Sequence, residues 1–336
     1  MLAEIATTPA GSRNDIKIKM KLQFYLVLSI AALVFTACAP SPTTQAPTLA
    51  ATLSIAPTEA SVAAFTPTPL PSLTPIITIS PITPHPQIVV LATNLPEPDD
   101  LLLAPDGSIY QSDVGDGIIW RYTKDNGAQI YLSGFNEPEG MVILPDGSLI
   151  IVEQRKNRLV RYDPTSRTLT TFLNLRNTTD QMGVDGIALD DHNPNVPTLI
   201  VPDSPNGTVL RVSLDGKTVT KIASGFVRPT GAWVEPDGSI LISDEYGNSL
   251  DRIRLDDTVE KLATLPTPDD VVEDAAGNIF VSTLGDNAIH LISFATKQNS
   301  ILISDIIQPQ GIIFDSDGNL IVTDPGNHRL IKLIIH

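Results

Sequence analysis

The sequence predicts an all-β fold, a six-bladed β-propeller over residues 87–336 with four antiparallel strands in each blade. A unit of about forty residues recurs along this stretch, and repeats of that length with several strands per copy are typical of propellers. Turn glycines mark five of the copies: Gly107, Gly147, Gly238, Gly277 and Gly318. Their separations are 40, 91, 39 and 41 residues, and the gap of 91 residues holds one irregular copy near Asp185.

Each copy is predicted to contain four short strands, of which the first is apolar and is followed by a Pro-Asp-Gly turn or a relative. The second strand ends in an acid in five copies, and the third carries a basic residue at a fixed position. The acids are Asp113, Glu153, Asp203, Asp244 and Asp324, and the basic residues are Arg121, Arg161, Arg211, Arg252, His290 and Lys332. We interpret both sets as structural, since such acids cap turns and charges pair across strands.

The fourth strands close the ring. Six complete blades can be counted only if the N-terminal segment 87–92 supplies the last strand of the last blade. Pairing the two ends of a propeller in this way removes an exposed sheet edge. We therefore predict an N-terminal closing strand over residues 87–92.

Residues 1–37 are predicted to be a secretory signal. Three lysines precede an apolar run over residues 22–37, which is shorter than the roughly 20 residues of a membrane span. The run ends in Phe35-Thr36-Ala37-Cys38, which resembles the cleavage motif of bacterial lipoproteins, and that resemblance implies a lipidated Cys38. Met20 is an alternative start, because the acids before it do not suit a signal. An uncleaved membrane helix is the competing interpretation.

Residues 38–86 are predicted to be a stalk that follows the lipidated cysteine. The 48 residues from 39 to 86 contain 11 Pro and 10 Thr and no glycine, lysine or arginine. Such a composition cannot bury enough apolar surface to fold, and its prolines keep it extended. We expect an extracytoplasmic protein anchored through Cys38 to a bacterial membrane or cell surface.

The charge of the repeat domain limits its partners. Residues 87–336 contain 35 Asp and Glu against 18 Lys and Arg. An excess of acid of this size argues against nucleic acid as a partner. Cys38 is the one cysteine in the chain, so no disulfide is expected. We expect a monomer.

Candidate functional residues begin the innermost strands, where all blades meet at the channel. These ring residues are Asp99, Glu139, Asp185, Thr230, Asp269 and Gln310. The following position is glycine in four blades, which allows close backbone approach at a crowded axis. In the other two blades Asp100 and Asp270 add two more acids at this position.

Carboxylates that converge on one channel repel each other, so either some remain protonated or a cation holds them. Oxygen ligands without imidazoles favour Ca²⁺ over zinc or copper. The alternative is that these side chains cap their strands and face water in the channel. The sequence leaves both interpretations open.

The stretch 87–336 resembles two kinds of six-bladed propeller. Blade six, with Asp324-Pro325-Gly326-Asn327-His328-Arg329, is similar to NHL repeats. Blade four, with Arg228-Pro229-Thr230-Gly231, Pro236-Asp237-Gly238 and Ser243-Asp244, resembles gluconolactonase and regucalcin sequences.

The second resemblance implies a central divalent metal, usually calcium. Its ligands are an acid in blade one, an Asn in blades three and four and an Asp in blade five, which correspond to Asp99, Asp185, Thr230 and Asp269. Thr230 replaces an Asn of the family pattern, and Glu139 can supply a further oxygen.

The same resemblance implies hydrolysis of a lactone or ester, with Asp269 as general base or nucleophile. The alternative is a non-catalytic, NHL-like propeller that binds a protein, peptide or glycan by its loops. A third interpretation is a quinone-dependent sugar dehydrogenase, for which His192 is the one plausible base.

Overall fold

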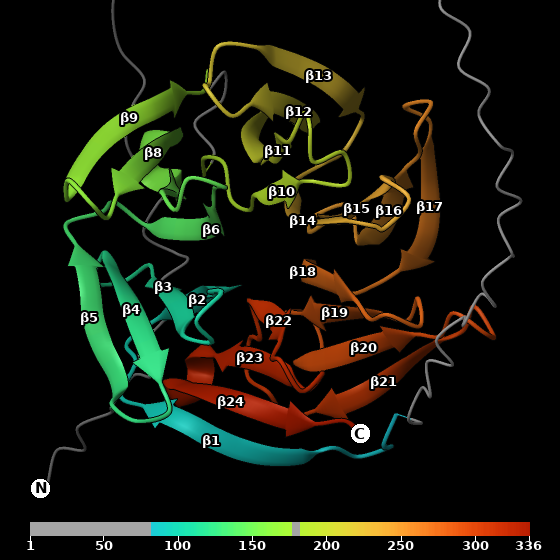
Figure 1. The fold of residues 1–336 in the computed structure, drawn as a ribbon. Coiled ribbons are helices and arrows are strands. Elements are labelled where there is room, and N and C mark those ends of the chain that lie inside the picture. Colours follow the sequence, from blue (N-terminus) through green and yellow to red (C-terminus); the bar gives the residue numbers. More distant parts are fainter. Residues whose placement is uncertain (1–81, 177–181) are drawn as a thin grey trace, which may run out of the picture. The chain divides into compact units, whose positions relative to one another are not determined.

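The computed structural model describes residues 82–176 and 182–336. The predicted signal, lipidation site and most of the predicted stalk lie outside these residues. Twenty-four strands form six four-stranded antiparallel sheets, arranged as blades around a central axis (Figure 1). The prediction of an all-β, six-bladed propeller is confirmed. Among the described residues no helix is long and apolar enough to span a membrane.

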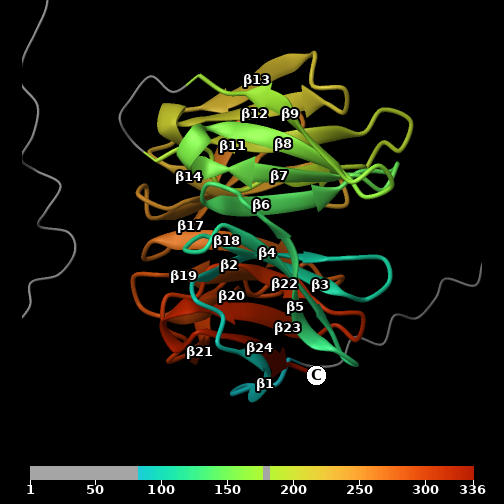
Figure 2. The same cartoon turned by 90° about the vertical axis from the view of Figure 1, so that its left-hand side faces the viewer.

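Within blades 1 to 5 the strands follow the chain from the axis outward (Figure 1), and Figure 2 shows the propeller from the side. Blade 1 contains β2 (Pro98–Leu103), β3 (Ile109–Asp113), β4 (Ile118–Thr123) and β5 (Gly127–Ser133). Blade 2 contains β6 (Pro138–Ile143), β7 (Leu149–Glu153), β8 (Arg158–Asp163) and β9 (Thr168–Asn174). Blade 3 contains β10 (Ala188–Asp190), β11 (Thr198–Asp203), β12 (Thr208–Ser213) and β13 (Val219–Ser224).

The remaining three blades repeat the pattern. Blade 4 contains β14 (Pro229–Val234), β15 (Ile240–Asp244), β16 (Ser249–Ile253) and β17 (Val259–Thr264). Blade 5 contains β18 (Pro268–Glu273), β19 (Ile279–Thr283), β20 (Ala288–Ile292) and β21 (Asn299–Ser304). Blade 6 contains β22 (Ile312–Phe314), β23 (Leu320–Asp324), β24 (Arg329–Ile334) and, from the other end of the chain, β1 (Gln87–Thr93). Short 3₁₀ turns η2 (Gln154–Lys156), η3 (Ser204–Asn206) and η4 (Pro325–Asn327) follow three of the second strands.

The closing strand is confirmed, and it ends one residue later than predicted. β1 pairs antiparallel with β24 from Gln87 opposite Ile334 to Thr93 opposite Arg329, with a bulge between Val90 and Ala92. β1 thereby covers the outer edge of β24 and gives the last blade four strands, like the other five.

The hydrophobic core lies between the blades. Six clusters of buried residues are present, one at each interface between neighbouring blades. Phe280 of blade 5, for example, packs edge-on against Phe314 of blade 6 with ring centroids 5.5 Å apart. Because the core is divided in this way, the axis itself is free to carry polar side chains.

The acids that end the second strands have the structural role that was predicted. Asp113, Glu153, Asp244 and Asp324 each accept backbone N–H bonds from the loop that leads into their own blade. These bonds fix the loops just before the innermost strands. In blades 1, 2, 4 and 6 the position of the ring residue therefore depends on a buried acid one strand further out.

The basic residues of the third strands are also structural. Arg121 pairs with Asp106 at 2.6 Å and Lys332 with Asp315 at 2.5 Å, so the guanidinium or ammonium reaches the acid of the first turn. His290 donates to or accepts from Asp286 and Asn299, each at 2.9 Å. It lies within blade 5 and belongs to this set rather than to the axis.

Candidate functional site at the propeller axis

The structure places the ring residues at equivalent points around the axis. Asp99, Glu139, Thr230 and Asp269 are the second residues of β2, β6, β14 and β18, each after a proline. Asp185 and Gln310 precede the shorter inner strands β10 and β22. All except Gln310 are buried, and Asp99 and Glu139 are each 5% exposed.

Glycines let the inner strands approach closely. A Cβ atom added to Gly231 would lie 2.5 Å from the carbonyl oxygen of Asp269, and one added to Gly186 would lie 2.5 Å from that of Thr230. These distances are too short for any side chain, so the predicted role of the glycines is confirmed. The ring residues are consequently drawn into a narrow space.

Asp99 and Glu139 form a carboxyl pair. Burial raises the pKa of Asp99 to about 7, although a hydrogen bond with Glu139 lowers it. Burial and the negative charge of Asp99 raise the pKa of Glu139 well above its ordinary value. The amide of Gln310 also donates to Asp99 Oδ2 at 3.1 Å. The physical picture is a protonated Glu139 that donates to an ionised Asp99.

Asp269 has a different environment. Its carboxyl group has no hydrogen-bond partner among the described residues. Burial, followed by the charges of Asp185 and Asp99, raises its pKa well above the ordinary value. The Thr230 hydroxyl donates to the backbone oxygen of Asp269 at 2.9 Å, not to its carboxyl group.

An arginine that the sequence analysis did not single out lies beside the ring. Nη2 of Arg228 is 2.5 Å from Oδ2 of Asp185, and its Nε donates to Glu245, in the turn after β15. Gln154 donates to the same Asp185 oxygen at 2.9 Å. Burial alone would lower the pKa of Arg228, but the charges of Asp185 and Glu245 raise it. Arg228 is therefore a fixed positive charge at the axis.

The signal for Arg228 was present in the repeat alignment. In blade 4 the proline that precedes the ring residue follows Arg228. At the same position the other blades have a residue that is not basic, such as Glu97, Glu137 or Thr267. Glu245 and Gln154 directly follow acids of the second strands. None of the three recurs from blade to blade, so the pattern of recurring residues does not indicate them.

Asp100 and Asp270 lie one residue further along the inner strands. Asp270 accepts the backbone N–H groups of Val271 at 2.8 Å and Ile312 at 3.1 Å, and burial raises its pKa to about 7. The Asp100 carboxyl group has no hydrogen-bond partner among the described residues. Burial and the charge of Asp270 raise its pKa well above the ordinary value.

The donor chemistry of the ring suits a hard cation, since carboxyl and hydroxyl oxygens dominate. Among the described residues, however, the positions of these oxygen atoms do not form a ready-made metal site. Within residues 82–176 and 182–336, no three His, Cys, Asp or Glu side chains are grouped as ligands of one metal ion. Asp185 is paired with Arg228, and the Thr230 hydroxyl is bonded to backbone oxygen. Asp99, Glu139 and Asp269 are the ring acids without a basic partner at hydrogen-bonding distance.

His192 does not join the ring. Its Nδ1 is 2.5 Å from Asp190, the last residue of β10. Its imidazole lies against Gly238, in the turn between β14 and β15. Both neighbours are at the opposite end of the inner strands from the ring residues, so His192 cannot act on a molecule held there.

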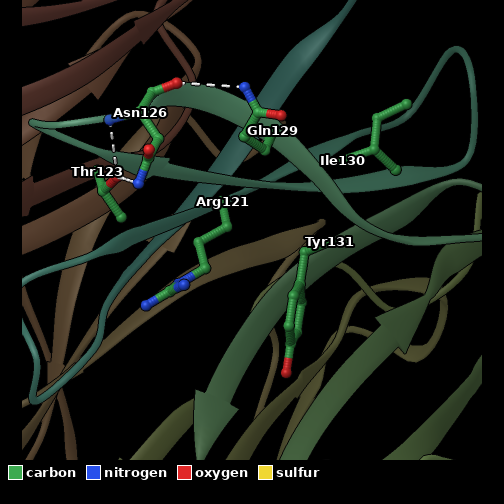
Figure 3. Close-up of a pocket in the computed structure, with 6 residues that line it drawn as sticks. All are labelled: Arg121, Thr123, Asn126, Gln129, Ile130 and Tyr131. Atoms are coloured by element: carbon green, nitrogen blue, oxygen red, sulfur yellow. Dashed lines mark hydrogen bonds between the residues drawn. The ribbon is translucent and has the colours of Figure 1, made fainter.

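A pocket away from the axis lies on the outer strands of blade 1. Its volume is about 390 Å³, and it is lined by Arg121, Thr123, Asn126, Gln129, Ile130 and Tyr131 (Figure 3). Asn126 and Gln129 hydrogen-bond with neighbours in the same turn. Arg121 forms an ion pair with Asp106, so the one charged side chain that lines this pocket already has a partner.

Six blades closed by the N-terminal strand, with buried carboxyl groups around the axis, define a propeller whose central channel is the candidate functional site. The chain belongs to the SMP-30/gluconolactonase/LRE-like family, whose profile matches residues 101–333. A comparison of the sequence with curated proteins finds no match.

Solved structures show the same fold. The calcium-binding protein regucalcin from Agrobacterium tumefaciens is 18% identical, with a TM-score of 0.62 over 76% of this chain and 96% of that one. A gluconolactonase from Xanthomonas campestris is 15% identical, with a TM-score of 0.61 over 74% and 89%. Virginiamycin B lyase from Staphylococcus aureus is 16% identical, with a TM-score of 0.57 over 74% and 99%.

Proposed function

We propose that the ring binds a divalent cation of the calcium type and that the protein hydrolyses a lactone or another ester outside the cytoplasm. The observation that carries this proposal is the surplus of buried carboxyl groups at the axis. Asp99, Glu139 and Asp269 have raised pKa values because they are buried close to other acids. A bound cation would remove that repulsion, so cation binding and ionisation of the ring would support each other.

Asp99, Glu139 and Asp269 are the proposed principal ligands. Asp185 and Thr230 are further oxygen ligands, and Asp185 is shared with Arg228. Family membership supports this set, since one structural neighbour is described as calcium-binding and another as a gluconolactonase. A bound divalent cation supplies polarisation of the ester carbonyl.

Asp269 is the proposed general base or nucleophile. As a base, its carboxylate takes a proton from a water molecule while the water oxygen bonds to the carbonyl carbon. The ester C–O bond then breaks, and the protonated Asp269 returns the proton to the leaving alkoxide. As a nucleophile, its carboxylate oxygen bonds to the carbonyl carbon, and the ester C–O bond breaks to release the alkoxide, which takes a proton from water. Water then hydrolyses the acyl-enzyme to the acid and the free carboxylate. The absence of a hydrogen-bond partner among the described residues leaves this carboxyl group available for either role.

The test is calorimetric titration with CaCl₂, followed by lactone turnover with and without a chelator. Asp269→Asn combined with Asp185→Asn is expected to abolish Ca²⁺ binding, whereas Asp317→Asn, an exposed turn acid, is the matched control. Unchanged Ca²⁺ affinity in the double variant would disprove the site. Turnover that persists in chelator would disprove the metal-dependent reaction while leaving the fold assignment intact.

A second candidate is a non-catalytic propeller that binds a protein, peptide or glycan. The observation that favours it is the ion pair between Arg228 and Asp185, which already neutralises one of the proposed ligands. Tight Ca²⁺ binding without turnover of any lactone or simple ester would select this function, with a structural ion at the axis.

We also propose that Cys38 carries a lipid that anchors the protein to a bacterial membrane. The sequence pattern before Cys38 supports this location. Expression in a bacterial host with a labelled fatty acid tests it. Label should enter the wild-type protein and be lost in Cys38→Ser, and a wild-type protein without label would contradict the anchor.

A further inference from the structure

A second cavity lies on the axis beyond the ring. Its volume is about 450 Å³, within the range of roughly 300 to 1,000 Å³ that is usual for small-molecule sites. It is lined by residues that follow the ring positions on the inner strands of all six blades, such as 101–103, 140–142 and 312–314. None of the six ring residues lines it. Asp191, which is exposed, forms part of its rim.

The wall of this cavity is apolar except for acids. Its charged lining residues, among those the structure describes, are Asp100, Asp191 and Asp270, and no basic side chain lines it. The remaining wall consists of two glycines and aliphatic or aromatic residues that include Trp233 and Phe314. Because the ring's guanidinium is engaged by Asp185 and Glu245, it does not neutralise Asp100 by direct contact.

Two residues that line the cavity, Asp100 and Trp233, carry a polar group without a hydrogen-bond partner among the described residues. The Asp100 carboxyl group has no hydrogen-bond partner among the described residues, and the like charge of Asp270 acts on it more strongly than any other charge. The Nε1–H of Trp233 is buried without an acceptor in the same part of the chain. A buried acid beside another acid is stabilised by a positive charge between or near them.

We propose that this cavity binds an organic ammonium compound, with its apolar body against the aliphatic and aromatic wall and its cationic group at Asp100 and Asp270. A metal ion alone would leave the apolar wall without a partner, and a neutral or anionic apolar molecule would leave the two acids uncompensated. The indole face of Trp233 adds an aromatic surface, which is favourable for cations. This inference does not depend on the proposed hydrolase function.

The two tryptophans of the chain allow a direct test. In a Trp120→Phe variant of the full chain, fluorescence reports on Trp233 alone. The probes are n-hexylammonium, 1-hexanol and hexanoate, which share an alkyl chain and differ in charge. All three probes are compared at one pH of about 8, at which n-hexylammonium is cationic, 1-hexanol is neutral and hexanoate is anionic.

Saturable change with n-hexylammonium is expected, with an affinity roughly tenfold or more above that for the other two probes. Asp100→Asn in the same background should remove this preference without affecting the fold, because the carboxyl group accepts no hydrogen bond. Asp317→Asn, outside the cavity, should leave it unchanged. Equal responses to all three probes, no response, or an ammonium preference that survives Asp100→Asn would each overturn the proposal.

Adding CaCl₂ separates this site from the ring. If the two sites are distinct, calcium bound at the ring should leave a saturable n-hexylammonium response in place. Complete competition between calcium and n-hexylammonium would show that a single cation site exists and would also overturn the proposal.

Discussion

The propeller contains two sets of buried acids that differ in their partners. The acids that end the second strands are surrounded by donors, as Asp244 accepts N–H bonds from Val227, Arg228 and Gly247. The ring acids Asp99, Glu139 and Asp269 lie close to other acids instead, and Asp269 has no hydrogen-bond partner among the described residues. Both sets of acids are buried, but the first stabilises loops and the second is the candidate ligand set. Complete hydrogen bonding marks a structural carboxyl group, and incomplete hydrogen bonding marks one available to a ligand.

The strongest test of this difference replaces one acid of each set. Asp244→Ala leaves three backbone N–H groups without their acceptor, so the free energy of unfolding should fall by about 3 kcal/mol or more. Asp269→Asn removes a repelling charge and should leave stability equal or higher. Urea denaturation measures both. Equal losses in the two variants would show that the sets do not differ.

Arg228 links the two sets, because its backbone N–H is held by Asp244 and its side chain by Asp185. Arg228→Met leaves two buried acids without their cation and should cost about 3 kcal/mol. CaCl₂ should restore much of this loss if the ring binds calcium. Arg252→Met is the matched control, since Glu235 lies away from the ring and should show no rescue. Thermal unfolding with and without CaCl₂ provides the measurement.

The pH dependence of stability distinguishes the sets without large structural change. Burial raises the pKa of Asp99 from its ordinary value of 3.8 to about 7, so the folded protein binds more protons than the unfolded chain between about pH 4 and pH 7. Stability in the absence of divalent cations should fall as the pH rises through this window. Asp99→Asn should reduce that slope. A stability that rises across the window would contradict the raised pKa.

The smallest effect is expected at the surface. Arg121 and Asp106 form a largely exposed pair at 2.6 Å, with side-chain exposures of 37% and 57%. Exposed pairs of this kind contribute about 1 kcal/mol at most. Arg121→Gln should change the urea midpoint only slightly, and a loss as large as that of Asp244→Ala would mean that burial does not govern these charges.

The sequence predicted the fold well because its information is repeated. Turn glycines at nearly constant spacing and an acid at the end of most second strands defined the blades, and the count of fourth strands required β1. The six ring positions were predicted for the same reason. Their placement at the axis follows from blade symmetry, which the alignment of copies contains directly.

The partners of the ring could not be predicted in this way. Arg228, Glu245 and Gln154 reach the axis through long side chains from loops whose sequences differ between blades. Their contacts depend on side-chain conformation and on the packing of adjacent blades, neither of which has a forty-residue period. For that reason the sequence did not predict that Arg228 and Gln154 bind Asp185. An exception in a repeat proved as informative as the repeat itself.

The closing strand has a consequence for the order of events in folding. β1 is among the first described residues to leave the ribosome, yet its partner β24 is among the last. Blades 1 to 5 can form from neighbouring segments as the chain grows, whereas blade 6 must join segments from its two ends. Contacts so distant in sequence form slowly. Blade 6 therefore closes only after β24 has been synthesised, and until β1 pairs with it the outer edge of β24 is open to proteases and chaperones.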